Sequence, residues 1–196
     1  HAFISLLIWD GEHIQDGAKY GIGRKMSTSP NNRISPNTSV TPDATVQRFD
    51  NLGYVIETKK SLPQNKEQWQ KEVNQLLKYD DTLAGWWTDD QLVDQQCTVL
   101  LIEISRAVDF ADYLRLFLDE TGIKFNNEMS VVFFARADEF KPHYMLRTQW
   151  GSIQDQDISD LLRRGKKVPV EAVTASFGER KFYDSEPATE FTMIVI

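Results

Sequence analysis

The sequence has few cysteines, no long apolar run and no excess of positive charge. Its single cysteine, Cys97, lies in an apolar segment, so no disulfide framework is possible and we expect a core residue of a cytoplasmic protein. The apolar segments are too short to span a bilayer, so we expect neither a membrane anchor nor a signal peptide. With 22 basic and 29 acidic residues the formal net charge is -7, which does not indicate the basic surface of a typical nucleic-acid binder.

Length and composition indicate one globular domain covering residues 1–196. The chain is 41% hydrophobic and 26% charged, which is typical of a folded protein with a core of ordinary size. It has no initiator methionine, and its last six residues have the pattern of a core strand. We therefore expect a domain excised from a longer protein, with residues 151–196 as a C-terminal extension of uncertain structure.

The hydrophobic pattern predicts an α/β fold, a mixed central sheet flanked by helices. Residues 96–105 and 129–135 are nearly continuous apolar runs, typical of strands buried on both faces. Apolar residues at helical spacing predict helices over residues 2–20, with a break near Gly11, and over residues 66–79, 107–120 and 158–164. Residues 143–150 are predicted to form a further strand.

Residues 42–60 are predicted to form a β-hairpin that carries three ionisable side chains. A tight turn at residues 50–53, Asp-Asn-Leu-Gly, would pair Asp50 with Gly53. In that register Asp43 lies opposite Lys60, and Asp43 and Glu57 are three residues apart, or about 10 Å at ~3.3 Å per residue. Twisting or splaying of the strands could still bring the two acids to one cation.

The hairpin residues suit metal-assisted hydrolysis of a phosphodiester. Glu57 and Lys59 are two residues apart and point to one face of their strand. A pair of carboxylates such as Asp43 and Glu57 binds a hard divalent cation, with water and phosphate completing the coordination. An ammonium on the same face can orient an attacking water and offset charge on the pentavalent phosphorus.

The motif Pro42-Asp43, followed after a hairpin by Glu57-Thr58-Lys59, resembles the signature of the PD-(D/E)xK nuclease superfamily. This resemblance implies a restriction-endonuclease-like core and an Mg²⁺- or Mn²⁺-dependent nuclease, with DNA a more expected substrate than RNA. It also implies that Asp43, Glu57 and the Thr58 carbonyl are metal ligands and that Lys59 is the catalytic lysine.

The next helix adds Gln75 and Tyr79, which are similar to the Q-xxx-Y motif of one branch of that superfamily. By the resemblance both side chains line the site and position substrate or the lysine. They belong to a polar helix stripe, at spacing i, i+4, i+7 and i+11, that begins with Gln68 and Glu72.

Other interpretations of the motif remain open. Glu-x-Lys also occurs at residues 139–141 and 179–181, outside the context of a Pro-Asp strand and a following Gln/Tyr helix. The hairpin could carry a solvated Glu and Lys, and the chain could be a catalytically inactive nuclease-fold module that binds protein or nucleic acid. A nucleotide hydrolase is a further alternative, although the sequence has no P-loop.

Several residues outside the hairpin are weaker candidates. In the resembled superfamily an acid on the first helix often approaches the metal, a role that Glu12 or His13 could fill, unless both lie on a solvated helix face. Glu103 could be a third acid. Trp86 and Trp87 could stack on bases, although paired tryptophans near a turn more often pack in a core or lid.

Two basic segments are candidate contacts for a nucleic-acid backbone. The long basic loop 21–41 contains Arg24, Lys25 and Arg33, and loops of this length are often functional. The densest cluster of positive charge is formed by Arg163, Arg164, Lys166 and Lys167. These residues could bind phosphates, or they could complement a helix dipole. Because the chain as a whole is acidic, we expect further domains or a homo-oligomer partner to contribute affinity.

Overall fold

The structure is a computed structural model that describes residues 1–8, 15–48, 50–87, 92–138, 141–170 and 173. In chain order the elements are α1 (Ala2–Ile8), β1 (Lys19–Ile22), β2 (Met26–Ser27), β3 (Ser39–Val40), β4 (Ala44–Gln47), β5 (Leu52–Lys59), η1 (Lys66–Gln68), α2 (Trp69–Tyr79), β6 (Gln95–Glu103), α3 (Ile104–Thr121), β7 (Glu128–Ala137), β8 (His143–Gly151), α4 (Gln156–Arg164) and β9 (Lys166–Pro169).

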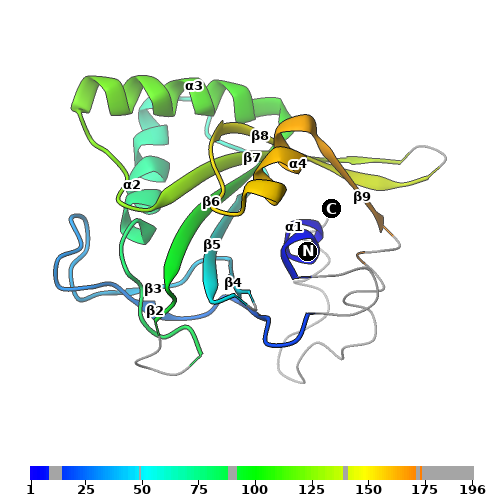
Figure 1. Cartoon of the computed structure of the whole chain (residues 1–196). Coiled ribbons are helices and arrows are strands. Elements are labelled where there is room, and N and C mark those ends of the chain that lie inside the picture. The colour runs from blue at the N-terminus through cyan, green and yellow to red at the C-terminus, as the bar shows by residue number, and fades with distance from the viewer. Residues whose placement is uncertain (9–14, 49, 88–91, 139–140, 171–172, 174–196) are drawn as a thin grey trace.

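The described residues form a mixed seven-stranded sheet in the order β1-β4-β5-β6-β7-β8-β9 (Figure 1). Strands β5, β6 and β7 run parallel in its centre, and the remaining pairs are antiparallel. The short strands β2 and β3 form a separate pair. The predicted mixed α/β architecture is thus confirmed, and none of the described helices is both long and apolar enough to cross a membrane.

Helices cover both faces of the sheet. Side chains of α1 and α4 share one apolar cluster with the sheet, and side chains of α2 and α3 share a second cluster. The alternation of side chains along a strand explains this division: Ile56 and Leu101 belong to the first cluster, whereas Leu100 and Ile102 belong to the second. Central strands covered on both faces need apolar residues at almost every position, as the sequence of β6 has.

The N-terminal segment differs from its predicted long helix. Helix α1 ends at Ile8, and Lys19–Ile22 forms the edge strand β1, paired with β4. Gly17 has a φ of 82°, a left-handed conformation that suits glycine and is incompatible with a continuous helix. Residues 9–14 lie outside the described part of the chain, so the expected break near Gly11 and the roles expected of Glu12 and His13 lie there too.

The C-terminal extension is part of the sheet as far as it is described. Helix α4 begins after Asp155, whose carboxylate accepts a hydrogen bond from the Ile158 amide at 2.9 Å. Strand β9 then pairs antiparallel with β8 and closes one edge of the sheet. Most of the remaining residues, 171–172 and 174–196, lie outside the described part.

Candidate active site

The hairpin of β4 and β5 brings Asp43 opposite Glu57. Its register pairs Ala44 with Ile56 and Gln47 with Gly53, so that Asp43, one residue before Ala44, is level with Glu57. The predicted register, which placed Asp43 opposite Lys60, was therefore wrong by three residues. The correction removes the separation expected between the two acids.

The turn lies earlier in the sequence than predicted. The Arg48 amide donates to the Leu52 carbonyl at 2.9 Å, and Asn51 occupies the left-handed position with a φ of 60°. Gly53 lies inside β5 instead of closing the turn. A Cβ atom on Gly53 would approach the Trp86 ring within 2.6 Å, so the glycine allows close packing of that side chain. Trp86 is fully buried and belongs to the core, which agrees with the expectation that paired tryptophans near a turn pack in a core or lid.

Asp43 is held by the backbone beside Glu57. The Thr58 amide donates to Asp43 Oδ2 at 2.7 Å, whereas Oδ1 has no hydrogen-bond partner among the described residues. Glu57 is 7% exposed. Burial raises the pKa of Glu57, and the nearby Asp43 carboxylate raises it further. A cation bound between the two acids would offset this cost of ionising Glu57.

Lys59 lies between two carboxylates. Its Nζ is 3.1 Å from Glu57 Oε1 and 3.1 Å from Glu72 Oε2. Burial acts to lower the pKa of Lys59, but Glu57 and Glu72 outweigh this effect and the pKa lies above its ordinary value. The ammonium therefore stays charged beside the acid pair. Glu72 had been recognised only as part of the polar helix stripe and not as a site residue; its spacing of three and seven residues from Gln75 and Tyr79 was the available signal.

Helix α2 supplies the other side of the site. The Tyr79 hydroxyl donates to Glu57 Oε2 at 3.1 Å, and the Gln75 side-chain amide donates to the Tyr79 hydroxyl at 2.5 Å. Burial and the Glu57 charge raise the pKa of Tyr79, so this group remains a neutral donor. Gln75 and Tyr79 thus reach the hairpin acids as a hydrogen-bonded chain, and they fix the orientation of Glu57.

A hollow lies on the other side of Asp43 and Thr58. It is lined by these two residues and by apolar side chains of α1 and the sheet, among them Phe3, Ile56 and Leu101. Helix α1 therefore lines this hollow beside Asp43 and Thr58, whereas Glu12, the acid expected near the metal, lies outside the described residues. Glu103 lies at the end of β6. Its neighbour Ile102 pairs with Lys59, so Glu103 and Lys59 belong to opposite faces of the sheet.

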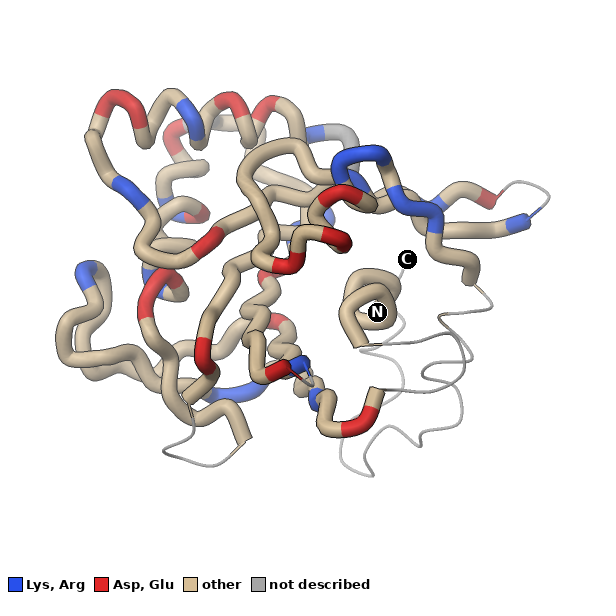
Figure 2. The backbone as a smooth tube through the Cα atoms, viewed as in Figure 1, with Lys and Arg blue, Asp and Glu red and all other residues tan. Residues whose placement is uncertain are grey.

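The predicted basic residues are distributed over separate places. The Arg33 guanidinium is 2.7 Å from the carboxylate of the buried Asp80 and is occupied by this ion pair. The cluster of Arg163, Arg164, Lys166 and Lys167 lies at α4 and β9 (Figure 2). Four strand spacings separate β9 from β5, about 19 Å at ~4.8 Å each, so these side chains do not line the acid site. Arg24 and Lys25 follow β1, which pairs with β4, the strand that begins directly after Asp43.

The donors fit a hard cation. Among the described residues no group of three or more His, Cys, Asp and Glu side chains could hold a metal ion. A cation would therefore depend on Asp43, Glu57, a backbone carbonyl such as that of Thr58, and water, an oxygen-only set that suits Mg²⁺ or Mn²⁺. Comparison of the chain with family models, with curated proteins and with solved structures finds no match.

Proposed function

We propose that the protein is a metal-dependent nuclease of the PD-(D/E)xK type with a restriction-endonuclease-like core. The observation that carries this proposal is the meeting of Asp43, Glu57 and Lys59 at one end of the β4–β5 hairpin, with Gln75 and Tyr79 attached. All five residues were named from the motif alone. A surface hairpin with a solvated Glu and Lys would show neither the burial of Glu57 nor its contacts with α2.

Each side chain has a role in phosphodiester hydrolysis. Asp43 and Glu57 would hold a Mg²⁺ or Mn²⁺ ion, which when bound supplies a Lewis acid and a water of lowered pKa. Tyr79 keeps the Glu57 carboxylate in place, supported by Gln75. Lys59, held as a cation, orients the attacking water and offsets the charge that develops on the phosphorus. DNA is the first substrate to test.

The test is one incubation series with Mn²⁺ and Mg²⁺ on supercoiled, linear and single-stranded DNA, on RNA and on free nucleotides. Cleavage of polynucleotides should depend on the cation, and Lys59→Ala should slow it by about 10² or more, as the loss of one transition-state donor does. Unchanged cleavage by Lys59→Ala would contradict the assignment. Release of product from free nucleotides alone would instead indicate a nucleotide hydrolase.

The alternative is a catalytically inactive module of the same fold, and the acidic net charge of -7 favours it. In that case Mn²⁺ could bind without any cleavage. The same series separates the two functions, because a gain in thermal stability with Mn²⁺ but no product from any polynucleotide supports the module.

A further inference from the structure

Two cations and a tryptophan form a cluster beside the candidate site. The Arg24 guanidinium carbon lies 4.6 Å from the centroid of the Trp87 ring, and Lys19 Nζ lies 5.9 Å from the same centroid. The face of an aromatic ring attracts cations, so the ring can hold two positive groups close together. We call Lys19, Arg24 and Trp87 the cation cluster.

The cation cluster lies on the sheet face that carries the acids. Lys19 pairs with Gln47 across β1 and β4, and Gln47 and Asp43 are four residues apart. All three residues therefore belong to the same face of the sheet. The amide of Gly23 donates to the Asp43 carbonyl at 3.0 Å. Arg24 is the next residue in the chain, so its backbone lies close to that of Asp43. The cluster therefore begins beside the proposed metal ligand and extends along β1.

Arg24 is fixed in place, and none of the described acids neutralises it. Its Nε donates to the Gly85 carbonyl at 2.8 Å, whereas its terminal amino groups have no hydrogen-bond partner among the described residues. No acidic side chain in the described ranges pairs with Arg24 or Lys19. In contrast, Arg48 and Lys59 each lie between two carboxylates. No described residue therefore takes up the positive charge of the cluster, and an external anion could pair with it.

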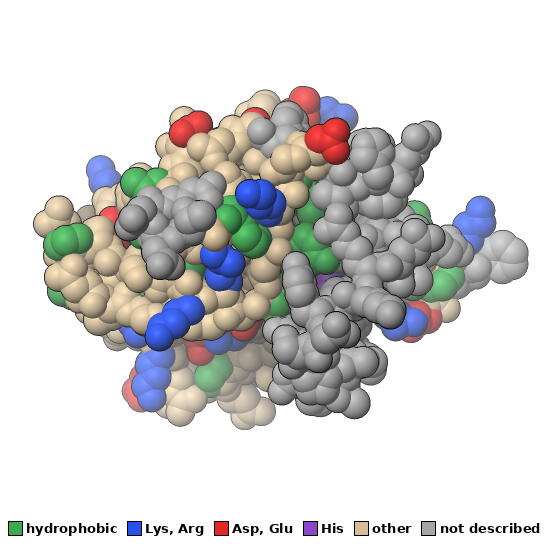
Figure 3. Space-filling view, turned by 90° about the horizontal axis from the view of Figure 1, so that it is seen from below, with side chains coloured by type: hydrophobic (Ala, Val, Ile, Leu, Met, Phe, Trp, Pro, Cys, Tyr) green, Lys and Arg blue, Asp and Glu red, His purple; other side chains and the backbone are tan. Residues whose placement is uncertain are grey.

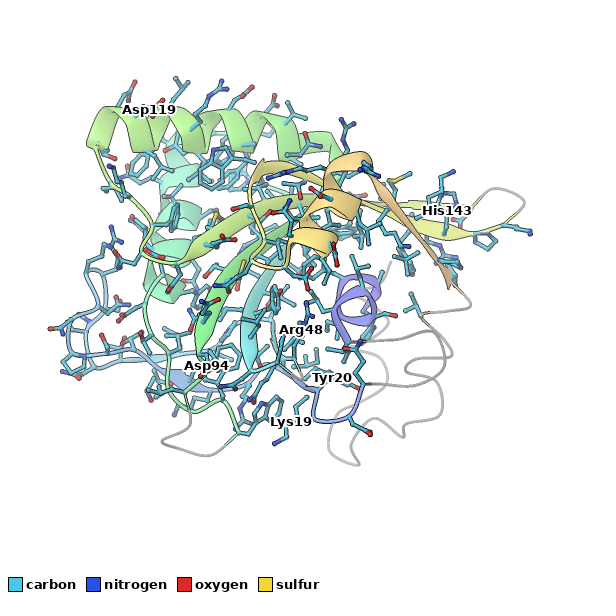
Figure 4. The ribbon with its side chains drawn as sticks, in the orientation of Figure 1. Lys19, Tyr20, Arg48, Asp94, Asp119 and His143 are labelled. Atoms are coloured by element: carbon cyan, nitrogen blue, oxygen red, sulfur yellow. The ribbon has the colours of Figure 1, made fainter. Side chains whose placement is uncertain are left out.

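We infer that the cation cluster binds backbone phosphates of the substrate strand next to the scissile phosphate; this inference rests on the proposed function. An arginine held by a carbonyl and a ring presents its free amino groups in a fixed direction, which suits bidentate contact with a phosphate. Lys19, further along β1, contacts the next part of the strand. Figure 4 places Lys19 at the bottom of the molecule. Figure 3, which views the molecule from below, shows several Lys and Arg side chains close together. Despite its acidic total charge, the protein thus has a local basic surface at the site.

The test measures binding of a short oligothymidylate without divalent cations, so that the strand stays intact, over a series of NaCl concentrations. Each lost phosphate contact lowers the slope of log K against log salt by about 0.7 for a single strand. The Lys19→Ala/Arg24→Ala variant should therefore lose about 1.4 of slope and bind at least tenfold more weakly. Trp87→Ala should weaken binding although it removes no charge, and Trp87→Phe, which keeps a ring, should restore most of it.

Lys124→Ala is the matched control, because Lys124 is an exposed cation that follows α3, and Figure 4 shows α3, with Asp119 labelled, at the opposite end of the molecule from Lys19. Its slope and affinity should be unchanged, and all variants should keep the thermal gain with Mn²⁺. An equal loss in Lys124→Ala, an unchanged slope in Lys19→Ala/Arg24→Ala, or no binding by the unmodified protein would each overturn the inference. If the cluster variants bind normally and the protein still cleaves, the inference fails and the nuclease stands. If the unmodified protein binds through the cluster but cleaves nothing, the nuclease fails and the binding site stands.

Discussion

Replacing Glu57 by Gln should affect the stability of the protein in opposite directions with and without a divalent cation. Burial and the Asp43 charge hold the pKa of Glu57 above its ordinary value of 4.5. A raised carboxyl pKa contributes stability that is present below the pKa of the unfolded chain and is lost as the pH rises through the pKa of the folded state. At neutral pH the ionised Glu57 therefore costs stability. Glu57→Gln avoids this cost and keeps an acceptor oxygen for Tyr79.

The expected magnitude follows from mass action. A cation at 100 times its dissociation constant stabilises the folded state by about 2.7 kcal/mol. At about 2–4 °C per kcal/mol for a chain of this size, the Tm of the unmodified protein should rise by about 5–10 °C with Mn²⁺. In Glu57→Gln, which offers one ligand charge fewer, this gain should largely disappear, while the Tm without metal at neutral pH should lie above that of the unmodified protein.

The assay is thermal unfolding at neutral pH and at pH 4, each with a chelator and with Mn²⁺. The advantage of Glu57→Gln without metal should shrink at acidic pH, where Glu57 becomes protonated in the unmodified protein as well. Asp50→Asn is the control, because Asp50 is an acid of the same hairpin that lies in the turn and should not affect the metal response. A full gain with Mn²⁺ in Glu57→Gln would refute the reasoning, as would a lower Tm without metal at neutral pH.

Substitutions at three further residues test the support of the site and of the fold. Glu72→Gln should slow cleavage by about tenfold through misplacement of Lys59, while the thermal gain with Mn²⁺ persists; loss of that gain would show that Glu72 is itself a metal ligand. Gly53→Ala should lower the free energy of unfolding in urea by about 1–3 kcal/mol, because its Cβ would collide with the Trp86 ring; an unchanged value would show that the ring can move. Asp80→Ala should cost about 1–3 kcal/mol in the same assay, because two backbone amides lose their acceptor, whereas Asp80→Asn keeps an acceptor and should cost less; equal losses would contradict this account.

The elements that could be predicted from sequence are those with long and regular patterns. The apolar runs of β6 and β7 and the stripe of α3 gave strands and a helix within a few residues of their observed bounds. The stripe of α2 placed Gln75 and Tyr79 toward the hairpin because helical periodicity over eleven residues leaves little freedom. Local pattern was sufficient wherever packing of one face decides the structure.

The hairpin register could not be predicted because two turn positions were compatible with the same residues. Asp, Asn and Gly all accept turn conformations, so residues 48–52 and 50–53 were both plausible. The choice depends on Gly53 lying under Trp86, a contact between residues far apart in the chain. The N-terminal helix was overextended for a similar reason, since Lys19–Ile22 gains backbone partners from β4 that no local pattern reveals.

The charges that meet at the hairpin are ones that a divalent cation would balance in the proposed nuclease. Three carboxylates and one ammonium lie close together here. Lys59 pairs with Glu57 and Glu72, and Asp43 lies opposite Glu57. With all four groups ionised, two negative charges remain uncompensated. Burial is the largest cause of the raised pKa of Glu57, and the negative charge of Asp43 raises it further. In the proposed nuclease a monovalent cation would leave one negative charge unbalanced, and a proton would occupy a carboxylate oxygen needed for the metal. One Mg²⁺ or Mn²⁺ would balance the cluster with every carboxylate ionised. Glu57 would be one of the residues that hold the cation, and the pairing of Lys59 with Glu72 would keep the ammonium in place beside it, so that lysine and cation could act in the same site.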